Sequence, residues 1–381
     1  MKIAFIFPYL PPARDGIGDY ISQLAKTLSQ ISDHELHILT STEQRPAPIP
    51  NVTIHPCFSV NPINATLHLL PTLQTLKPDW VILQFNQFSY GRWGFNPFLP
   101  YTLFRVRKAC PNTHIALMAH EDFVPVTSFK NAIITTWQRA QLWSLGQLSE
   151  HIFFSIEPWT KKYKTWFPHA PVTHLPVSSN LPHQEISKAE ARRTLKIPES
   201  TFVLGFFGNL HVSKLPTWTV ALAQALFQRK KDFLLLYAGP EGTQLQNQLL
   251  DIPFRDLGYQ PPEAISTFFA SLDLMSMPFI DGVSTRRGSF MAALQHGVPT
   301  LSTQGPLTDT MLREQNKQAF WLTPTEHLQQ FVEAGITLYL EPQIRNELGQ
   351  TGQVFFQRYF TWQHIAHKFL QAIQMTDLTP A

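Results

Sequence analysis

Residues 1–30 read MKIAFIFPYLPPARDGIGDYISQLAKTLSQ, and this stretch holds the pattern on which the fold prediction depends. An apolar run at residues 2–7 is followed by a glycine-containing loop and then by a stretch with helical periodicity. The apolar side chains of that stretch share one helical face: Tyr20, Leu24, Leu28 and Ile31. A strand, a short loop and an amphipathic helix in this order form the unit from which parallel sheets are built.

The same alternation continues along the chain. Continuous apolar runs, typical of strands buried on both faces, occur at residues 79–85, 113–119 and 151–156. Further strands are expected at 201–208, 233–239, 253–258 and 272–278. The pattern pauses in the polar, proline-containing stretch 178–200.

The sequence therefore predicts an α/β protein with two doubly wound, Rossmann-like domains. We expect an N-terminal domain at 1–180, completed by a C-terminal helix at 361–375, a linker at 181–200, and a second domain at 201–360. Ligands of such sheets bind beyond the carboxyl ends of the strands, and pockets favour domain interfaces. We accordingly expect the site in a central cleft that both domains face.

Composition excludes several function classes. The 381 residues are 44% hydrophobic and 15% charged, with a net charge of +3, which is too small to indicate nucleic-acid binding. The chain has no apolar run of about 18 residues that could span a membrane. Its two cysteines, Cys57 and Cys110, lie far apart. Reduced thiols in a cytoplasmic protein are the simplest interpretation.

Residues 281–300, DGVSTRRGSFMAALQHGVPT, place two adjacent arginines before an apolar helix. A helix N-terminus already carries a partial positive charge, so Arg286 and Arg287 worsen the local electrostatics unless an anion completes the site. A phosphate or diphosphate suits this position. A solvated helix start is the alternative. Small polar residues and glycine accompany the arginines and join them as candidate ligands: Ser284, Thr285, Gly288 and Ser289.

Other strand ends carry further candidate residues. Gly208 ends one run and Lys214 follows it by one loop, which suits a phosphate, although a solvated lysine is an equal alternative. Gly239 marks another glycine turn before a helix.

The first domain contributes candidates of its own. His120 and Glu121 directly follow the run at 113–119. Gly16 and Gly18 allow the backbone to approach a ligand closely, but without a third glycine they do not make a dinucleotide-binding loop, so an NAD-dependent enzyme is disfavoured. A tight turn without ligand contact, and a histidine that only caps a loop, remain the structural alternatives. No second histidine or cysteine lies at a metal-ligand spacing near His120, so we expect no metal.

The order of these segments resembles the retaining GT-B glycosyltransferases of glycosyltransferase family 4 over nearly the whole chain. Residues 8–28 look like the family's N-terminal glycine loop and helix. GNLHVSK at 208–214 looks like its G-R-L-x-x-x-K motif. The donor-domain segments are similar at 234–242, 257–278 and 292–303, and FTWQHIAHKFLQAI at 360–373 is similar to the C-terminal helix that returns to the first domain.

Two features depart from the family pattern. Asn209 stands where the family has arginine, so only Lys214 carries over from that motif. The family's paired glutamates, of which the second usually holds the donor ribose, fall on Ser284 and Ala292. The GVSTRRGS block at 282–289 resembles a variant that holds the donor through arginine, serine and backbone groups.

The resemblance implies metal-independent transfer of a sugar, with retention of configuration, from a nucleotide-sugar to a glycan or glycolipid acceptor, with no cofactor beyond the nucleotide-sugar. It makes His120, Arg286 and Lys214 the expected catalytic residues and places Asp15 and Glu121 on the acceptor side. The expected donor-binding residues are Gly16, Gly18, Gly208, Asn209, Lys214, Gly239, Tyr259, Ser284, Thr285, Arg286, Arg287, Gly288 and Ser289. A noncatalytic nucleotide-sugar or polysaccharide-binding protein on a degenerate GT-B scaffold is the alternative.

Residues 85–108, FNQFSYGRWGFNPFLPYTLFRVRK, concentrate aromatic side chains and cations. This combination suits a lipid interface, and it also suits a core helix with an ordinary basic face. The first interpretation predicts a cytoplasmic protein that contacts the inner face of a membrane peripherally.

Overall fold

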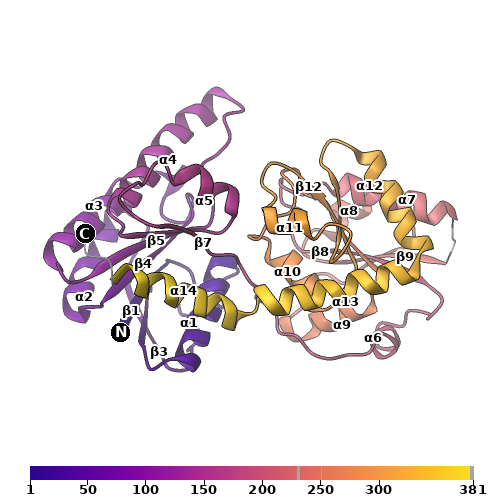
Figure 1. Ribbon diagram of the computed structural model, residues 1–381, viewed down its shortest axis with the longest axis horizontal. Helices are drawn as coiled ribbons and strands as arrows, with labels where there is room; N and C mark the ends of the chain where they lie inside the picture. Colours follow the sequence, from indigo (N-terminus) through magenta and orange to yellow (C-terminus); the bar gives the residue numbers. More distant parts are fainter. Residues whose placement is uncertain (230–231, 250, 378–381) are drawn as a thin grey trace. The chain divides into compact units, whose positions relative to one another are not determined.

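A computed structural model describes residues 1–229, 232–249 and 251–377 of the chain (Figure 1). Backbone contacts divide the chain into two compact units. The first unit comprises Met1–Pro176 together with the segment that begins at Trp362, and the second comprises Val177–Thr361.

The first unit is built on a parallel sheet with the strand order β3-β2-β1-β4-β5-β6-β7. Its strands are β1 (Lys2–Ile6), β2 (Glu35–Ser41), β3 (Val52–Phe58), β4 (Trp80–Phe85), β5 (His114–Ala119), β6 (His151–Phe154) and β7 (Val172–His174). The central strands β1, β4 and β5 are almost entirely buried, as their continuous apolar runs predict.

The helices of the first unit are α1 (Gly16–Ile31), η1 (Ile63–His68), α2 (Leu69–Leu76), η2 (Arg92–Gly94), α3 (Phe98–Ala109), α4 (Phe129–Gln147), α5 (Glu157–Tyr163) and α14 (Trp362–Asp377). Asp15 caps α1 by accepting hydrogen bonds from the backbone N–H groups of Ile17 and Gly18. The last helix, α14, is drawn in yellow in Figure 1 and packs on α1 of this unit. Its Phe369 ring lies 5.9 Å from Phe5 and 5.6 Å from Phe153.

The second unit contains a parallel sheet with the order β10-β9-β8-β11-β12-β13. Its strands are β8 (Phe202–Phe207), β9 (Phe233–Ala238), β10 (Phe254–Asp256), β11 (Leu274–Met277), β12 (Thr300–Gln304) and β13 (Trp321–Pro324). In chain order this is the 3-2-1-4-5-6 arrangement of the Rossmann fold. The expected doubly wound α/β fold class is therefore confirmed.

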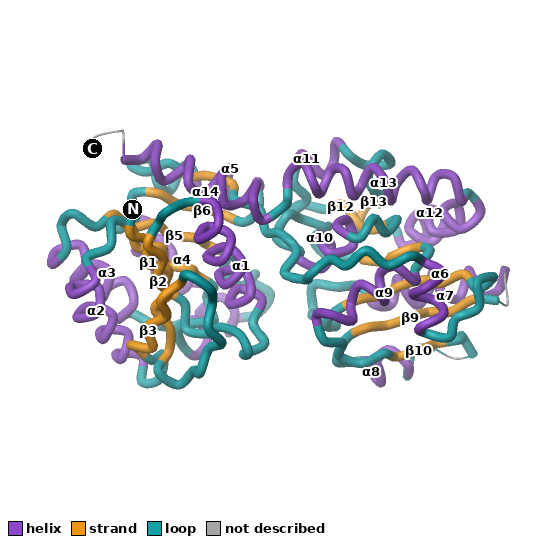
Figure 2. Tube along the Cα trace, turned by 90° about the horizontal axis from the view of Figure 1, so that it is seen from below, coloured by secondary structure: helices purple, strands orange, loops and turns teal. Residues whose placement is uncertain are grey.

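Helices cover both faces of this second sheet (Figure 2). They are α6 (Lys188–Thr194), α7 (Pro216–Arg229), α8 (Gly242–Gln246), η3 (Pro262–Ala264), α9 (Ile265–Ser271), α10 (Gly288–Gln295), α11 (Thr310–Glu314), α12 (Leu328–Leu340) and α13 (Pro342–Tyr359). One apolar core lies under α7 and α12, and the other lies under α9, α10 and α13.

The stretch 181–200, for which a linker is expected, contributes to the second unit. Arg192 of α6 is buried and its Nη2 lies 2.6 Å from Asp273 Oδ2, while Ile197 joins the apolar core. The helix α6 packs on α9. A buried guanidinium that pairs with a carboxylate across 81 residues holds this stretch in place.

Strands β8 and β11 lie side by side at the centre of the second sheet, where the strand order reverses. The loops leaving their carboxyl ends meet, since Leu215 N–H donates to Pro278 O at 3.0 Å and Ile280 N–H donates to Ser213 O at 2.9 Å. Lys214 lies between these bonds, opposite Phe279. Such a switch point is where open α/β sheets bind ligands.

Candidate functional site

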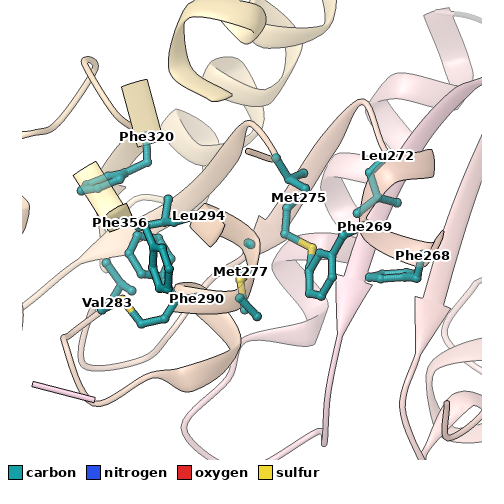
Figure 3. Packing of buried hydrophobic residues seen from close by; sticks show 14 of the residues in the cluster. Phe268, Phe269, Leu272, Met275, Met277, Val283, Phe290, Leu294, Phe320 and Phe356 are labelled. Carbon is teal, nitrogen blue, oxygen red and sulfur yellow. The ribbon is translucent and has the colours of Figure 1, made fainter. Parts of the chain in front are cut away.

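The arginine pair directly precedes α10. Arg287 is the N-cap residue of this helix, and its carbonyl accepts a hydrogen bond from Phe290 N–H at 2.9 Å. Phe290 and Leu294 are fully buried in the core of the second unit, where they pack with other apolar side chains (Figure 3). This packing fixes the helix, and with it the backbone that carries the arginines, Gly288 and Ser289.

The loop before the arginines is held on both sides. Val283 N–H donates to Thr303 O at 2.8 Å, and Thr285 N–H donates to Asp309 Oδ2 at 2.7 Å. Ser284 is fully buried, its carbonyl accepts from Arg287 N–H at 3.0 Å, and its Oγ makes no hydrogen bond among the described residues. A rigid loop thus presents a buried hydroxyl next to the arginines.

Lys214 lies at the end of β8. Its Nζ donates to Phe207 O at 2.6 Å and lies 3.2 Å from the position a Cβ of Gly208 would occupy. Gly208 has a φ of +81°, a conformation that glycine adopts without strain. The lysine side chain thus folds back over the glycine turn.

Lys214 lies in surroundings that disfavour its charged form. Burial and, to a smaller extent, the nearby Arg287 lower the pKa of Lys214 to about 7, while Glu241 opposes the effect. The Arg287 guanidinium lies 4.6 Å from the ring centroid of Phe279, which pairs with Lys214 through the backbone. The structure therefore brings Lys214 and Arg287 close enough to repel each other. Arg286 lies half-buried beside them in sequence.

A hydrogen-bond network connects the glycine turn at Gly208 with the one at Gly239. Tyr237 Oη donates to Gly208 O at 2.9 Å, and Glu241 Oε2 accepts from Leu210 N–H at 3.1 Å. A Cβ on Gly239 would lie 2.2 Å from Tyr237 Oη and 2.7 Å from Gly208 O, so only glycine fits there. The two turns are thereby locked together at the carboxyl edge of the sheet.

A pocket of about 130 Å³ opens at this edge. Four of the expected donor-binding residues line it: Gly208, Asn209, Gly239 and Tyr259. The other lining residues include the apolar Leu181, Pro240 and Pro262 and the polar Gln260. The pocket is small and largely apolar, and two glycines are among its lining residues, which suits a flat ring.

His120 follows β5 in the first unit. Its Nε2 lies 2.8 Å from Gln84 Oε1, and burial lowers its pKa to about 3. The imidazole is therefore neutral at physiological pH. With the proton on Nε2, that nitrogen donates to Gln84 and leaves Nδ1 as an acceptor. His120 can offer a hydrogen bond but not a positive charge.

Tyr20 lies against His120. The two rings meet edge to face at 5.0 Å, and the Tyr20 hydroxyl is buried with no hydrogen-bond partner among the described residues. Burial raises the pKa of Tyr20. A neutral hydroxyl and a neutral imidazole thus lie together at the carboxyl end of the first sheet.

Of the remaining candidate residues in the first unit, Asp15 and Gly18 have structural roles, whereas Gly16 and Glu121 do not show one. The Asp15 carboxylate is engaged in capping α1, and Gly18 packs so closely on Tyr9 that a Cβ would lie 2.5 Å from its carbonyl oxygen. Gly16 has open space on its Cβ side. Glu121 is half-buried next to His120 in the chain. Gly18 therefore has a packing role, whereas Gly16 can admit a ligand.

Sequence reasoning missed several residues that shape these sites: Gln84, Tyr20, Glu241 and Phe279. Gln84 is a buried polar residue inside an otherwise apolar strand, which is a signal in the sequence. Glu241 follows a glycine turn, and its partners become visible only when β8 and β9 pair. Among the described residues, no cluster of three or more histidine, cysteine or acidic side chains forms a possible metal site.

The sequence matches no protein-family profile. A curated relative, the D-inositol 3-phosphate glycosyltransferase of Corynebacterium urealyticum, is 28% identical over 153 residues, which amount to 32% of this chain and 36% of the relative. The chain thus matches about a third of that relative's length.

Solved structures are similar over nearly the whole chain. Sucrose-phosphate synthase of Thermosynechococcus elongatus has a TM-score of 0.79 at 14% identity, covering 99% of both chains. HepE of Anabaena, solved in complex with UDP and glucose, has a TM-score of 0.70 at 14% identity, covering 98% of this chain and all (100%) of that one. Trehalose 6-phosphate synthase of Burkholderia multivorans has a TM-score of 0.66 at 9% identity, covering 99% of this chain and 98% of that one. Two parallel sheets together with these whole-length similarities show that the chain has the GT-B fold.

Proposed function

We propose that the protein is a retaining glycosyltransferase that moves a sugar from a nucleotide-sugar to a glycan or glycolipid acceptor without a metal ion. The observation that carries the proposal is the meeting of Lys214, Arg287 and the N-terminus of α10 at the switch point of the second sheet. Two cations that meet at a helix N-terminus suit an anionic ligand such as a diphosphate. The GT-B fold supports the same class of reaction.

The diphosphate of the donor binds between Lys214 and the arginine loop. Negative charge builds on this leaving group as the glycosidic bond breaks, while the sugar becomes oxocarbenium-like. Preorganised cations and backbone N–H groups stabilise that charge more strongly than the charge of the bound donor. Arg286 and Arg287 contribute paired donors on planar guanidinium groups, which match phosphate oxygens. Ser284, Thr285, Gly288 and Ser289 add hydroxyl and backbone donors.

The nucleoside binds in the pocket lined by Gly208, Asn209, Gly239 and Tyr259. The glycine backbones allow a ring to approach the sheet edge closely. HepE, a structural neighbour, is solved with UDP-glucose, which makes UDP-sugars the first donors to test.

His120 orients the sugar as a neutral hydrogen-bonding group. Its low pKa means that it does not act as a cation and that its role does not change with pH in the physiological range. Asp15, Gly16 and Glu121 face the acceptor. Because Asp15 caps α1, it acts on the acceptor through the position of the Gly16 loop.

The proposal includes a cytoplasmic location and a role in assembling a polysaccharide or glycolipid. The two cysteines are free, which suits a reducing compartment.

A noncatalytic nucleotide-sugar or polysaccharide-binding protein is the second candidate. The observation that favours it is the burial of Ser284 and Ala292, both fully inaccessible, where the family resemblance expects glutamates. A scaffold that had lost its function would be expected to lose Lys214 early, since burial and Arg287 disfavour its charge in the empty protein. Its presence favours the enzyme.

A thermal-shift panel of nucleoside diphosphates and nucleotide-sugars tests the proposed site. A ligand at 100 times its Kd adds about 2.7 kcal/mol to the unfolding free energy, which is easily measured. We expect stabilisation by at least one nucleoside diphosphate and its sugar conjugates, and loss of that effect in Arg287→Ala. A panel that leaves the melting temperature unchanged contradicts the proposal.

A further inference from the structure

The helix α4 has two apolar faces. One packs into the first unit through Ile134, Leu142 and Leu145. The other exposes Phe129, Ile133 and Trp143, with 83%, 46% and 51% of their surface accessible. Positions 129, 133, 140 and 143 fall on one stripe of an α-helix. An apolar row of this kind on a helix surface marks an interaction site.

The loop around η2 continues this stripe. Trp93 and Phe95 are about half-exposed. Trp137 of α4 joins them, because its Nε1 donates to Trp93 O at 3.0 Å and its ring meets Phe95 edge to face at 5.8 Å. We call Trp93, Phe95, Phe129, Ile133, Trp137 and Trp143 together the aromatic surface.

Cations flank the aromatic surface. Lys130 Nζ lies 5.2 Å and the Arg92 guanidinium 4.8 Å from the Trp93 ring centroid. Arg139 lies 5.6 Å from the Trp166 ring and lines an open groove of about 450 Å³ together with Trp143. Arg92, Lys130 and Arg139 thus place three cations at or beside this surface. The partner should therefore be negatively charged.

We propose that the aromatic surface docks the protein on an anionic phospholipid membrane, with Phe129 and Ile133 in the acyl boundary and Arg92 and Lys130 at the lipid phosphates. Tryptophan and cations beside an apolar helix face are the combination that such an interface binds. Among the described residues, no helix is both long enough and apolar enough to cross a bilayer. The contact is therefore peripheral.

This surface differs from the one that sequence alone indicates at 85–108. The loop of η2 belongs to that stretch, but α4 does not. Docking is also independent of the proposed sugar transfer, so it can be tested without a donor or an acceptor.

Cosedimentation with vesicles tests the proposal. The vesicles are phosphatidylcholine alone or phosphatidylcholine with about a third phosphatidylglycerol, at low and at high salt. The wild-type protein should bind the anionic vesicles at low salt, bind neutral vesicles weakly, and lose affinity as salt rises. Lys130→Glu should lower the affinity at least about fivefold, and Phe129→Ser about tenfold.

Matched controls come from the second unit. Lys317→Glu reverses a cation that lies 4.9 Å over the Trp321 ring, and Leu340→Ser removes a side chain that is 60% exposed. Both controls should bind vesicles like the wild type. Because Phe129 is almost fully exposed, Phe129→Ser should melt at the wild-type temperature.

Three results would overturn the proposal. The first is a wild-type protein that does not bind anionic vesicles at low salt. The second is binding that neither Lys130→Glu nor Phe129→Ser weakens more than the controls do. The third is a wild-type dimer that Phe129→Ser converts to a monomer, since this outcome assigns the aromatic surface to a second copy of the chain.

Discussion

Replacing Lys214 with methionine removes an ammonium group while keeping the length of the side chain. In the folded protein Nζ donates to Phe207 O at 2.6 Å and lies 5.5 Å from the Phe206 ring centroid. Burial first, and then Arg287, lower the pKa of Lys214 to about 7 from the ordinary value of 10.5. The empty site thus disfavours the charged lysine, and Lys214→Met relieves that cost.

The size of the effect follows from the pKa. At 1.36 kcal/mol for each pKa unit, the difference between 10.5 and about 7 corresponds to about 4–5 kcal/mol. Lys214 is only half-buried, so solvent screens part of this cost. The lost hydrogen bond to Phe207 removes about another 1 kcal/mol. We expect Lys214→Met to raise the unfolding free energy near pH 7 by about 1–2 kcal/mol, or roughly 2–8 °C in Tm.

The lowered pKa of Lys214 determines how the stability of the folded protein changes with pH. The unfolded chain keeps the lysine proton up to its ordinary pKa of 10.5, whereas the folded protein releases it above about 7. The wild type therefore becomes more stable as pH rises through this window. The stability advantage of Lys214→Met should be largest below about pH 7 and should shrink towards about pH 10.

Nucleotide affinity should change in the opposite direction to stability. Loss of one charged hydrogen bond to the diphosphate costs about 1.5–3 kcal/mol of binding. The assay is a set of thermal melts across pH together with a UDP titration. Lys317→Met, an exposed lysine of the same unit, is the control and should alter neither quantity. A Lys214→Met protein that melts below the wild type and binds UDP equally well would refute the reasoning.

Three further predictions concern other residues. Replacing Arg286 or Arg287 with alanine should weaken nucleoside diphosphate binding by about 1.5–3 kcal/mol, measured by calorimetric titration. Thermal melts of the empty variants should show a melting temperature that is unchanged or slightly raised. Replacing the arginine with lysine should restore only part of the binding. His120→Ala should lower kcat by about 10²–10³ with nearly normal UDP affinity, and the wild-type kcat should show no inflection from His120 between about pH 5 and 9, because the pKa of His120 is about 3. Gly239→Ala should cost about 1–3 kcal/mol of stability, because its Cβ would lie 2.2 Å from Tyr237 Oη; denaturant unfolding measures this, and an unchanged midpoint contradicts the packing argument.

The sequence predicts the elements whose apolar pattern is strong and local. The runs at 201–208 and 272–278 contain β8 and β11, and the arginine pair ends where α10 begins at Gly288. The sequence carries little signal for β3, an edge strand at Val52–Phe58 whose burial is incomplete and which contains Pro56.

Some residues of the candidate site can be predicted from the sequence, and others cannot. Lys214 and the arginines are visible in the sequence because cations and glycines follow apolar runs. The pairing of Gln84 with His120, and of Glu241 with Leu210, joins residues that lie 36 and 31 positions apart. These contacts depend on the strand order, which local periodicity does not encode.

The most direct test of the central claim is nucleoside diphosphate release from a donor without added acceptor. Purified protein is incubated with UDP-glucose and related nucleotide-sugars, and the released diphosphate and free sugar are followed by NMR. The account predicts slow hydrolysis of at least one donor, with retained configuration in the first-formed sugar, and its loss in both Lys214→Met and Arg287→Ala. A donor that binds tightly at this site but is never consumed, even with candidate acceptors present, would contradict it and assign the protein a binding role.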